Sequence, residues 1–138
     1  MKPLTRRCVV AAGAAVPAAG LLSACGGSGE SDPSATQAPG IATGELIGRA
    51  SDVPVGGCAV FPDVKVVVAQ PTEGEFRAFG ATCTHQGCLV SSSTEGDIPC
   101  KCHASHFSLE DGSVISGPAP APLPAVEITV DGDDLRTA

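Results

Sequence analysis

The sequence lacks an apolar run long enough to cross a membrane. The stretch that comes nearest, residues 8–22, has only 15 residues, is rich in alanine and glycine, and contains Pro17. A spanning helix needs about 20 predominantly apolar residues. Because this short stretch follows a cationic N-terminus, it is typical of an export signal, and we predict a signal peptide over residues 1–24.

The end of this stretch predicts a lipid anchor. Residues 22–25 read Leu-Ser-Ala-Cys, which is typical of a lipobox in which Cys25 is lipidated and becomes the mature N-terminus. Arg6 and Arg7 resemble a twin-arginine export signal, and an ordinary secretory signal or an uncleaved anchor are the alternatives. Residues 25–40 are rich in glycine, serine and proline and are expected to form a flexible tether. We therefore expect the protein at the extracytoplasmic face of the cell membrane.

Basic residues are scarce. The chain has 8 lysines and arginines against 15 acidic residues, and removal of residues 1–24 leaves a net charge of about −10. This balance argues against nucleic acid as a partner and against direct adhesion to anionic lipid. An acidic surface on the folded domain, residues 41–138, suits a partner protein with a basic docking patch, and solubility alone explains it equally well.

The chain also lacks a helical hydrophobic period outside the signal, and we find no internal repeat. Residues 64–70 are β-branched, residues 75–79 alternate, and turn residues 71–74 between them predict a hairpin. Residues 125–130 alternate in the same way, with residues 134–137 as a returning strand. Shorter strands are expected at residues 45–47, 58–61, 106–108 and 113–115. The pattern predicts an all-β domain.

Only three histidines are present, and two lie in short runs that also hold cysteines. Residues 83–88 read C-T-H-Q-G-C, and residues 100–105 read C-K-C-H-A-S. Thiolate and imidazole select iron–sulfur clusters, zinc or copper. One zinc ion could take a cysteine and a histidine from each run, but structural zinc sites usually pair the two types separately. A binuclear cluster explains the interleaving better, and structural disulfides with incidental histidines are a further alternative.

The two runs resemble the two boxes of the Rieske iron–sulfur family, and residues 117–120 (Gly-Pro-Ala-Pro) resemble its proline loop. The resemblance implies a small Rieske-type β-sandwich or barrel, with a cluster-binding subdomain of two loops plus the proline loop. It also implies one [2Fe–2S] cluster. The residues it implies are Cys83 and Cys100 on one iron, His85 and His103 on the other iron, and Cys88 with Cys102 as a disulfide. Such a disulfide needs an oxidising compartment, which agrees with the signal peptide.

Three residues are implied around the ligands. Ser105 stands where respiratory members carry a serine whose hydroxyl donates to the cluster, and Phe107 stands where they carry a tyrosine. Pro118 belongs to the loop that covers the cluster in this family. Because hydrogen bonds to the cluster raise its reduction potential, the missing tyrosine predicts a potential below that of respiratory members.

Further departures concern the loops themselves. Lys101 replaces a proline, and Ala104 replaces a glycine and is strained if its φ is positive. Gln86 replaces a leucine of quinol-oxidising members, which puts docking into an apolar quinol site in doubt. Cys58 is left over, either as a buried thiol acting as a small hydrophobe or as a partner for another chain.

The resemblance implies a one-electron transfer component with no catalytic site of its own, and the export signal and lipobox predict that it is membrane-tethered and extracytoplasmic. Its partner would be a redox protein, either a cytochrome or an exported oxidoreductase. Two alternatives stay within electron transfer: the iron–sulfur subunit of a cytochrome bc-type quinol-oxidising complex, and a small subunit of an exported oxidoreductase. The non-redox alternative is a structural or sensing lipoprotein.

Overall fold

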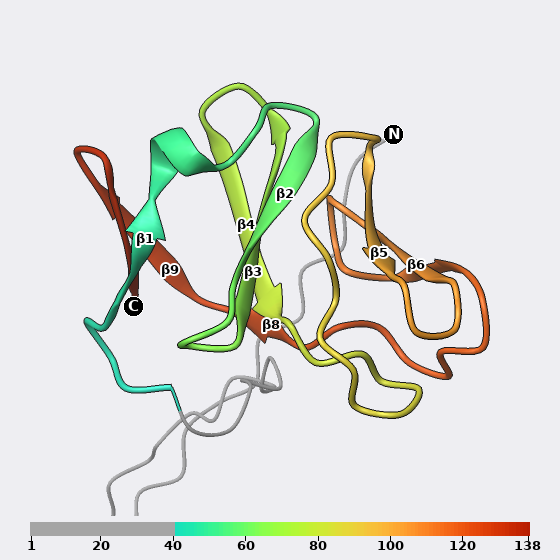
Figure 1. Ribbon diagram of the computed structural model, residues 1–138. Helices are drawn as coiled ribbons and strands as arrows, with labels where there is room; N and C mark the ends of the chain where they lie inside the picture. The colour runs from blue at the N-terminus through green and yellow to red at the C-terminus, as the bar shows by residue number, and fades with distance from the viewer. Residues whose placement is uncertain (1–40) are drawn as a thin grey trace, which may run out of the picture. The chain divides into compact units, whose positions relative to one another are not determined.

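The structure, a computed structural model, describes residues 41–138, and the predictions made for residues 1–40, including lipidation of Cys25, lie outside them. Within the described part the chain is built from β-strands and one 3₁₀ turn, η1 (Ala50–Asp52), which confirms the all-β prediction (Figure 1). None of the described residues form a helix long and apolar enough to span a membrane. The strands are β1 (Leu46–Arg49), β2 (Gly57–Phe61), β3 (Val66–Thr72), β4 (Glu75–Gly80), β5 (Asp97–Cys100), β6 (Ser105–Ser108), β7 (Val114–Ser116), β8 (Ala125–Val126), β9 (Ile128–Asp131) and β10 (Asp134–Thr137).

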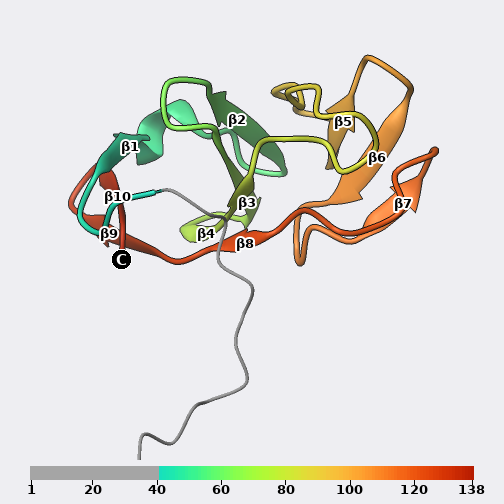
Figure 2. The ribbon, with the colours of Figure 1, turned by 90° about the horizontal axis from the view of Figure 1, so that it is seen from below.

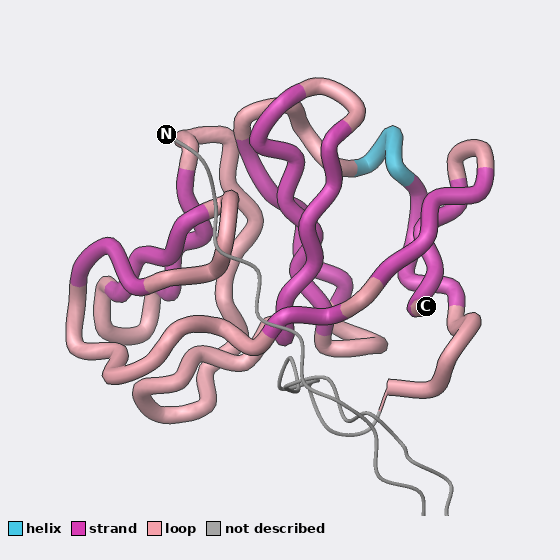
Figure 3. The backbone as a smooth tube through the Cα atoms, turned by 180° about the vertical axis from the view of Figure 1, so that it is seen from behind, coloured by secondary structure: helices cyan, strands magenta, loops and turns pink. Residues whose placement is uncertain are grey.

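The strands form three antiparallel sheets. The terminal sheet has the order β1-β10-β9, the central sheet β2-β3-β4-β8, and the third sheet β5-β6-β7. Figure 2 shows the central sheet between the other two. Long loops surround the third sheet, which consists of short strands (Figure 3). The predicted runs of cysteine and histidine lie at this end of the domain.

Strand β3 is buried on both faces. Val66 and Val68 pack into an apolar core shared with the terminal sheet, whereas Val67 and Ala69 pack into a second core shared with the third sheet. A strand with two buried faces has no polar side, which explains the unbroken β-branched run in the sequence. Each fully buried valine contributes about 1.5–3 kcal/mol relative to an exposed one, so β3 anchors both halves of the domain.

The first hairpin forms, with shifted boundaries. The strand expected at residues 64–70 begins at Val66, because Lys65 has φ 53° in the turn from β2. It then runs through Pro71 to Thr72, with an irregularity in the β3–β4 register after Ala69. Since proline cannot donate to the ladder, it is tolerated at such an irregularity. The predicted turn over residues 71–74 was therefore too long.

One further strand prediction was wrong in detail, and one strand was missed. Residues 125–130 form two strands, because β8 pairs with β4 in the central sheet and β9 pairs with β10 in the terminal sheet. Strand β5 was not predicted, since Pro99 lies inside it. Strand β5 is an edge of its sheet, and edge strands are where proline is accepted.

Candidate metal centre

The first box forms a closed loop after β4. The N–H of Cys83 donates to the carbonyl of Cys88 at 2.7 Å, and the N–H of Gly87 donates to the carbonyl of Cys83 at 3.0 Å. Gly87 has φ 78°, a conformation that glycine adopts without a steric penalty. These bonds close the base of the loop and leave His85 and Gln86 at its tip.

The second box is the turn of the β5–β6 hairpin. Cys100 and Ser105 face each other as the last pair of the ladder, so residues 101–104 form the connection. Ala104 has φ 58°, which costs a residue with a Cβ atom about 1–2 kcal/mol. The condition under which strain was expected at Ala104, a positive φ, is therefore met.

A disulfide between Cys88 and Cys102 ties the two loops together, as the resemblance implied. The two residues are 14 apart in sequence, and their Cα atoms are 6.5 Å apart. Thr84 adds a second link, because its hydroxyl donates to the carbonyl of Ala121 at 2.6 Å. The first box is thus joined both to the second box and to the segment after the proline loop.

The two remaining box cysteines are free and buried beside each other. Cys83 and Cys100 are 3% and 1% exposed. Burial raises the pKa of the Cys100 thiol, and the neighbouring Cys83 thiol raises it further, while backbone N–H groups of Cys102 and His103 lower it. The pair therefore offers two adjacent sulfurs, and the backbone of the second box favours the charged form of the Cys100 sulfur.

The two histidines form a second pair. The rings of His85 and His103 lie with centroids 4.6 Å apart and planes at 86°. The Nδ1 atom of His85 is buried and has no hydrogen-bond partner. An unpaired buried polar atom costs about 1–3 kcal/mol, and coordination to a metal would remove that cost. His103 is exposed, so one of the two imidazoles reaches the surface.

These residues fit a [2Fe–2S] cluster. Among residues 41–138, no three histidine, cysteine or acidic side chains gather closely enough to hold one metal ion; the donors come as one sulfur pair and one imidazole pair. Cys83 and Cys100 would hold one iron and His85 and His103 the other, with the cluster supplying a one-electron couple. The role of each ligand stays a prediction.

The proline loop packs directly on the second box. Gly117 has φ 94°, and a Cβ atom there would lie 2.5 Å from the Cα of Ser105. The N–H of Ala119 donates to the Ser105 hydroxyl oxygen at 3.2 Å. Pro118 between them is exposed. The loop therefore depends on a glycine at the contact and holds the buried Ser105 in place.

Phe107 is fully buried on β6, opposite Ile98 of β5. It belongs to the same apolar core as Cys83 and Cys100. Its ring supports the second box, and it has no hydroxyl to donate. The departures Gln86 and Lys101 are both exposed on the loops.

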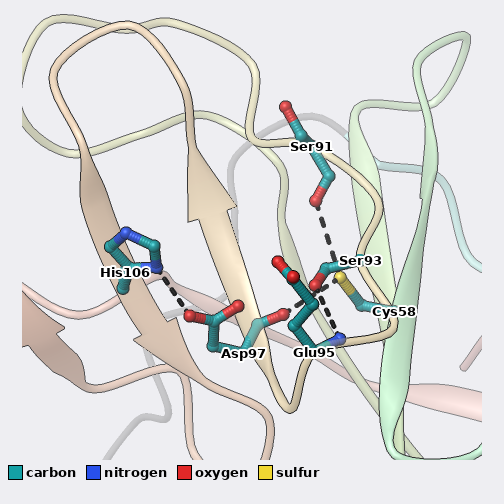
Figure 4. Close-up of polar contacts among 6 residues, drawn as sticks. All are labelled: Cys58, Ser91, Ser93, Glu95, Asp97 and His106. Carbon is teal, nitrogen blue, oxygen red and sulfur yellow. Dashed lines mark hydrogen bonds and ion pairs between the residues drawn. The ribbon is translucent and has the colours of Figure 1, made fainter.

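Sequence reasoning missed one polar pair near the boxes. His106 Nδ1 lies 2.6 Å from the Asp97 carboxylate, which joins β6 to β5 (Figure 4). No partner for His106 could be identified from the sequence, because β5 was not recognised as a strand. A groove of about 620 Å³ lies nearby, lined by residues of η1, β2 and segment 92–101. It contains Lys101 and none of the four expected ligands.

Comparisons with known proteins give the same family. The Rieske [2Fe-2S] domain family matches residues 45–127, more than half of the chain. The cytochrome b6-f complex iron-sulfur subunit of Chlorobaculum tepidum is 41% identical over 88 residues, which cover 62% of this chain and 48% of that protein. A Haloferax mediterranei protein, named provisionally as the Rieske subunit of a respiratory nitrate reductase, is 39% identical over 46% of this chain and 29% of its own length. The chain thus spans about half or less of these curated relatives.

Solved structures agree. The plasma membrane Rieske protein of Synechocystis has a TM-score of 0.55 and 29% identity, covering 68% of this chain and 98% of its own. The ferredoxin of carbazole 1,9a-dioxygenase from Nocardioides aromaticivorans has a TM-score of 0.56 and 22% identity, covering 70% and 98%, and this likeness concerns the fold alone. With the two linked loops, the sulfur and imidazole pairs and the matching family domain, the chain belongs to the Rieske [2Fe–2S] family of iron–sulfur electron-transfer proteins.

Proposed function

We propose that this protein is a membrane-tethered extracytoplasmic carrier of single electrons. The observation that carries the proposal is the paired donor set, two buried sulfurs and two imidazoles, at loops linked by a disulfide. The exposed imidazole of His103 gives an electron a short route between the site and a docked protein. Because disulfides persist in oxidising compartments, the Cys88–Cys102 bond supports a location outside the cytoplasm.

The tether rests on the N-terminal sequence. Arg6-Arg7, the short apolar stretch and Cys25 together support export followed by lipidation. A flexible tether of residues 25–40 would let the domain move between a donor and an acceptor while it stays at the membrane.

The partner we propose is a redox protein complex that presents a basic patch. Between residues 81 and 123 Lys101 is the single lysine or arginine, against four acidic residues. Opposite charge across the contact would steer association and make its rate fall with salt. A cytochrome or an exported oxidoreductase fits this description.

A second candidate function is that of iron–sulfur subunit in a cytochrome bc-type quinol-oxidising complex. The b6-f subunit of Chlorobaculum tepidum and a hyperthermophilic respiratory Complex III, the latter with TM-score 0.50 and 25% identity, favour it. The polar, exposed Gln86 at the loop tip and Phe107 without a hydroxyl count against it. The Haloferax mediterranei relative favours instead a small subunit of an exported oxidoreductase.

Fractionation of cells that produce the full chain tests the tether. We expect the protein in the membrane fraction, labelled by a lipid precursor, with Cys25→Ser released as a soluble extracytoplasmic form. Arg6→Lys with Arg7→Lys should retain it in the cytoplasm. Recovery of Cys25→Ser in the membrane would contradict the lipid anchor.

Redox-titrated EPR of the isolated protein tests the carrier function. We expect a rhombic spectrum with a low average g value and a reversible one-electron titration. If physiological donors do not reduce the bound cluster and physiological acceptors do not reoxidise it, the structural or sensing lipoprotein is favoured. Quinol-dependent reduction of a cytochrome by membranes, lost with this protein, would favour the bc-type complex instead.

A further inference from the structure

Cys58 is free and buried, and neither the disulfide nor the expected ligand set uses it. It lies on β2, the edge strand of the central sheet, where the segment leading into β5 pairs antiparallel with it (Figure 4). Its side chain is 1% exposed, so no sulfur surface is free to pair with another chain. Its position points to a role inside the domain.

The thiol of Cys58 contacts two carbonyl oxygens. Its Sγ lies 3.6 Å from the carbonyl oxygen of Ser91 and 3.7 Å from that of Asp97. Burial raises the pKa of Cys58 to about 11, so the sulfur keeps its proton at physiological pH. A protonated thiol is a weak donor, and here its one hydrogen is shared between two acceptors on the segment that forms the third sheet.

The backbone makes a tight contact at the same place. The N–H of Cys58 donates to the carbonyl of Ser93 at 2.8 Å, and the N–H of Ser93 returns a bond to the carbonyl of Cys58 at 3.1 Å. A Cβ atom on Gly57 would overlap the carbonyl oxygen of Ser93. We call this contact the β2–β5 junction; it comprises Gly57, Cys58, Ser91, Ser93 and Asp97.

The junction continues into β6. The carbonyl of Asp97 faces Cys58, while its carboxylate holds His106 at 2.6 Å. Asp97 of β5 therefore contacts both β2, through Cys58, and β6, through His106. Strand β5 ends at Cys100, so the linkage reaches the second box directly.

The two expected thiolate ligands come from different sheets. Cys83 follows β4 of the central sheet, and Cys100 ends β5 of the third sheet, so the distance between their sulfurs depends on how the two sheets pack. We propose that Cys58 is a positioning residue for the cluster, which fixes β5 on the central sheet and thereby sets the Cys100 sulfur relative to Cys83. This inference rests on ligation by Cys83 and Cys100 and not on the tether, and the EPR spectrum of the unaltered protein tests that ligation first.

Two substitutions at Cys58 distinguish the effect of its hydrogen-bond donor from the effect of its side-chain volume. Cys58→Val keeps an apolar side chain of similar size without a donor, and Cys58→Ser keeps a donor. We expect Cys58→Val to shift the g values and the midpoint potential of the bound cluster, and Cys58→Ser to restore them part of the way. Val90→Ala is the matched control, because Val90 is buried in the same core without a polar contact from its side chain.

If Cys58→Val leaves the g values and potential unchanged, or if Val90→Ala shifts them as much, Cys58 is only a small apolar filler and the proposal fails. If Cys58→Val does not fold, the proposal can still be tested on a protein that retains Cys58. In a holoprotein with Cys8→Ser and Cys25→Ser, Cys58 carries the remaining thiol proton, and its infrared S–H band should lie at the lower frequency of a hydrogen-bonded donor. A band at the frequency of a free thiol would overturn the proposal.

Discussion

The amide N–H of Ala119 in the proline loop donates a 3.2 Å hydrogen bond to the hydroxyl oxygen of Ser105. Ser105 is fully buried at the start of β6, and because its oxygen accepts this bond, its own proton stays available to a sulfur of the site. One side chain thus joins the proline loop to the box that supplies two expected ligands.

Ser105→Ala should lower the reduction potential, since it would remove the hydroxyl that the resemblance places as a donor to the cluster, and such a bond stabilises the added charge of the reduced cluster. It should also lower the free energy of unfolding by about 1–3 kcal/mol, because the N–H of Ala119 loses its acceptor. Redox titration and thermal denaturation measure the two effects. Ser108→Ala, on the same strand but with an exposed hydrogen bond, is the control and should leave the potential unchanged.

Phe107→Tyr should raise the potential, because a phenolic hydroxyl would restore the donor that respiratory members carry at this position. Phe107 lies on β6, two residues after Ser105 of the second box, and in the core that contains Cys83 and Cys100. Phe79→Tyr adds the same group elsewhere in that core and provides the comparison. Equal shifts in both variants would show that core polarity alone sets the potential.

Ala104→Gly should raise the free energy of unfolding by about 1 kcal/mol, since glycine adopts the φ of 58° without the steric cost of a Cβ atom. For a domain of this size, the melting temperature should rise by about 4–8 °C. Ala121→Gly, at a position without a positive φ, should be neutral or destabilising. A melting temperature that falls in both variants would contradict strain at Ala104.

Removal of the disulfide by Cys88→Ala with Cys102→Ala should cost about 3 kcal/mol, the value expected for a closed loop of about 15 residues. The cluster should also be lost faster in the presence of a chelator, because the two boxes would separate more readily. Denaturant unfolding and the decay of the visible absorbance measure these effects. Chemical reduction of the unaltered protein should reproduce them, and an unchanged decay rate would show that the disulfide does not hold the boxes together.

Alkaline pH should weaken the β2–β5 junction. Burial raises the folded-state pKa of Cys58 from 9.0 to about 11, so between these values the folded state holds a proton that the unfolded state has lost. Stability from this thiol is therefore complete below about pH 9 and falls as the pH rises toward 11, by up to about 2 kcal/mol. Denaturant unfolding at several pH values should show a smaller decline in Cys58→Ser, and equal declines would place the effect on other groups.

The sequence alone predicted the donor chemistry expected of the site. Cys83, His85, Cys100 and His103 lie in two short runs, so their residue types and spacing are local information. The all-β class followed in the same way from alternation and turn residues. Ala104 was also recognised as a departure that would be strained at a positive φ, and the structure supplies that φ.

Only the tertiary structure decided the contacts between segments distant in sequence. The Asp97–His106 pair, the split of residues 125–130 between two sheets and the junction at Cys58 all depend on strand register and on how sheets pack. Pro99 concealed β5, because its tolerance in a strand depends on that strand lying at an edge. The expected ligands can be read from individual side chains. The position of Cys100 relative to Cys83 depends on how the central and third sheets pack against each other, which local sequence does not reveal.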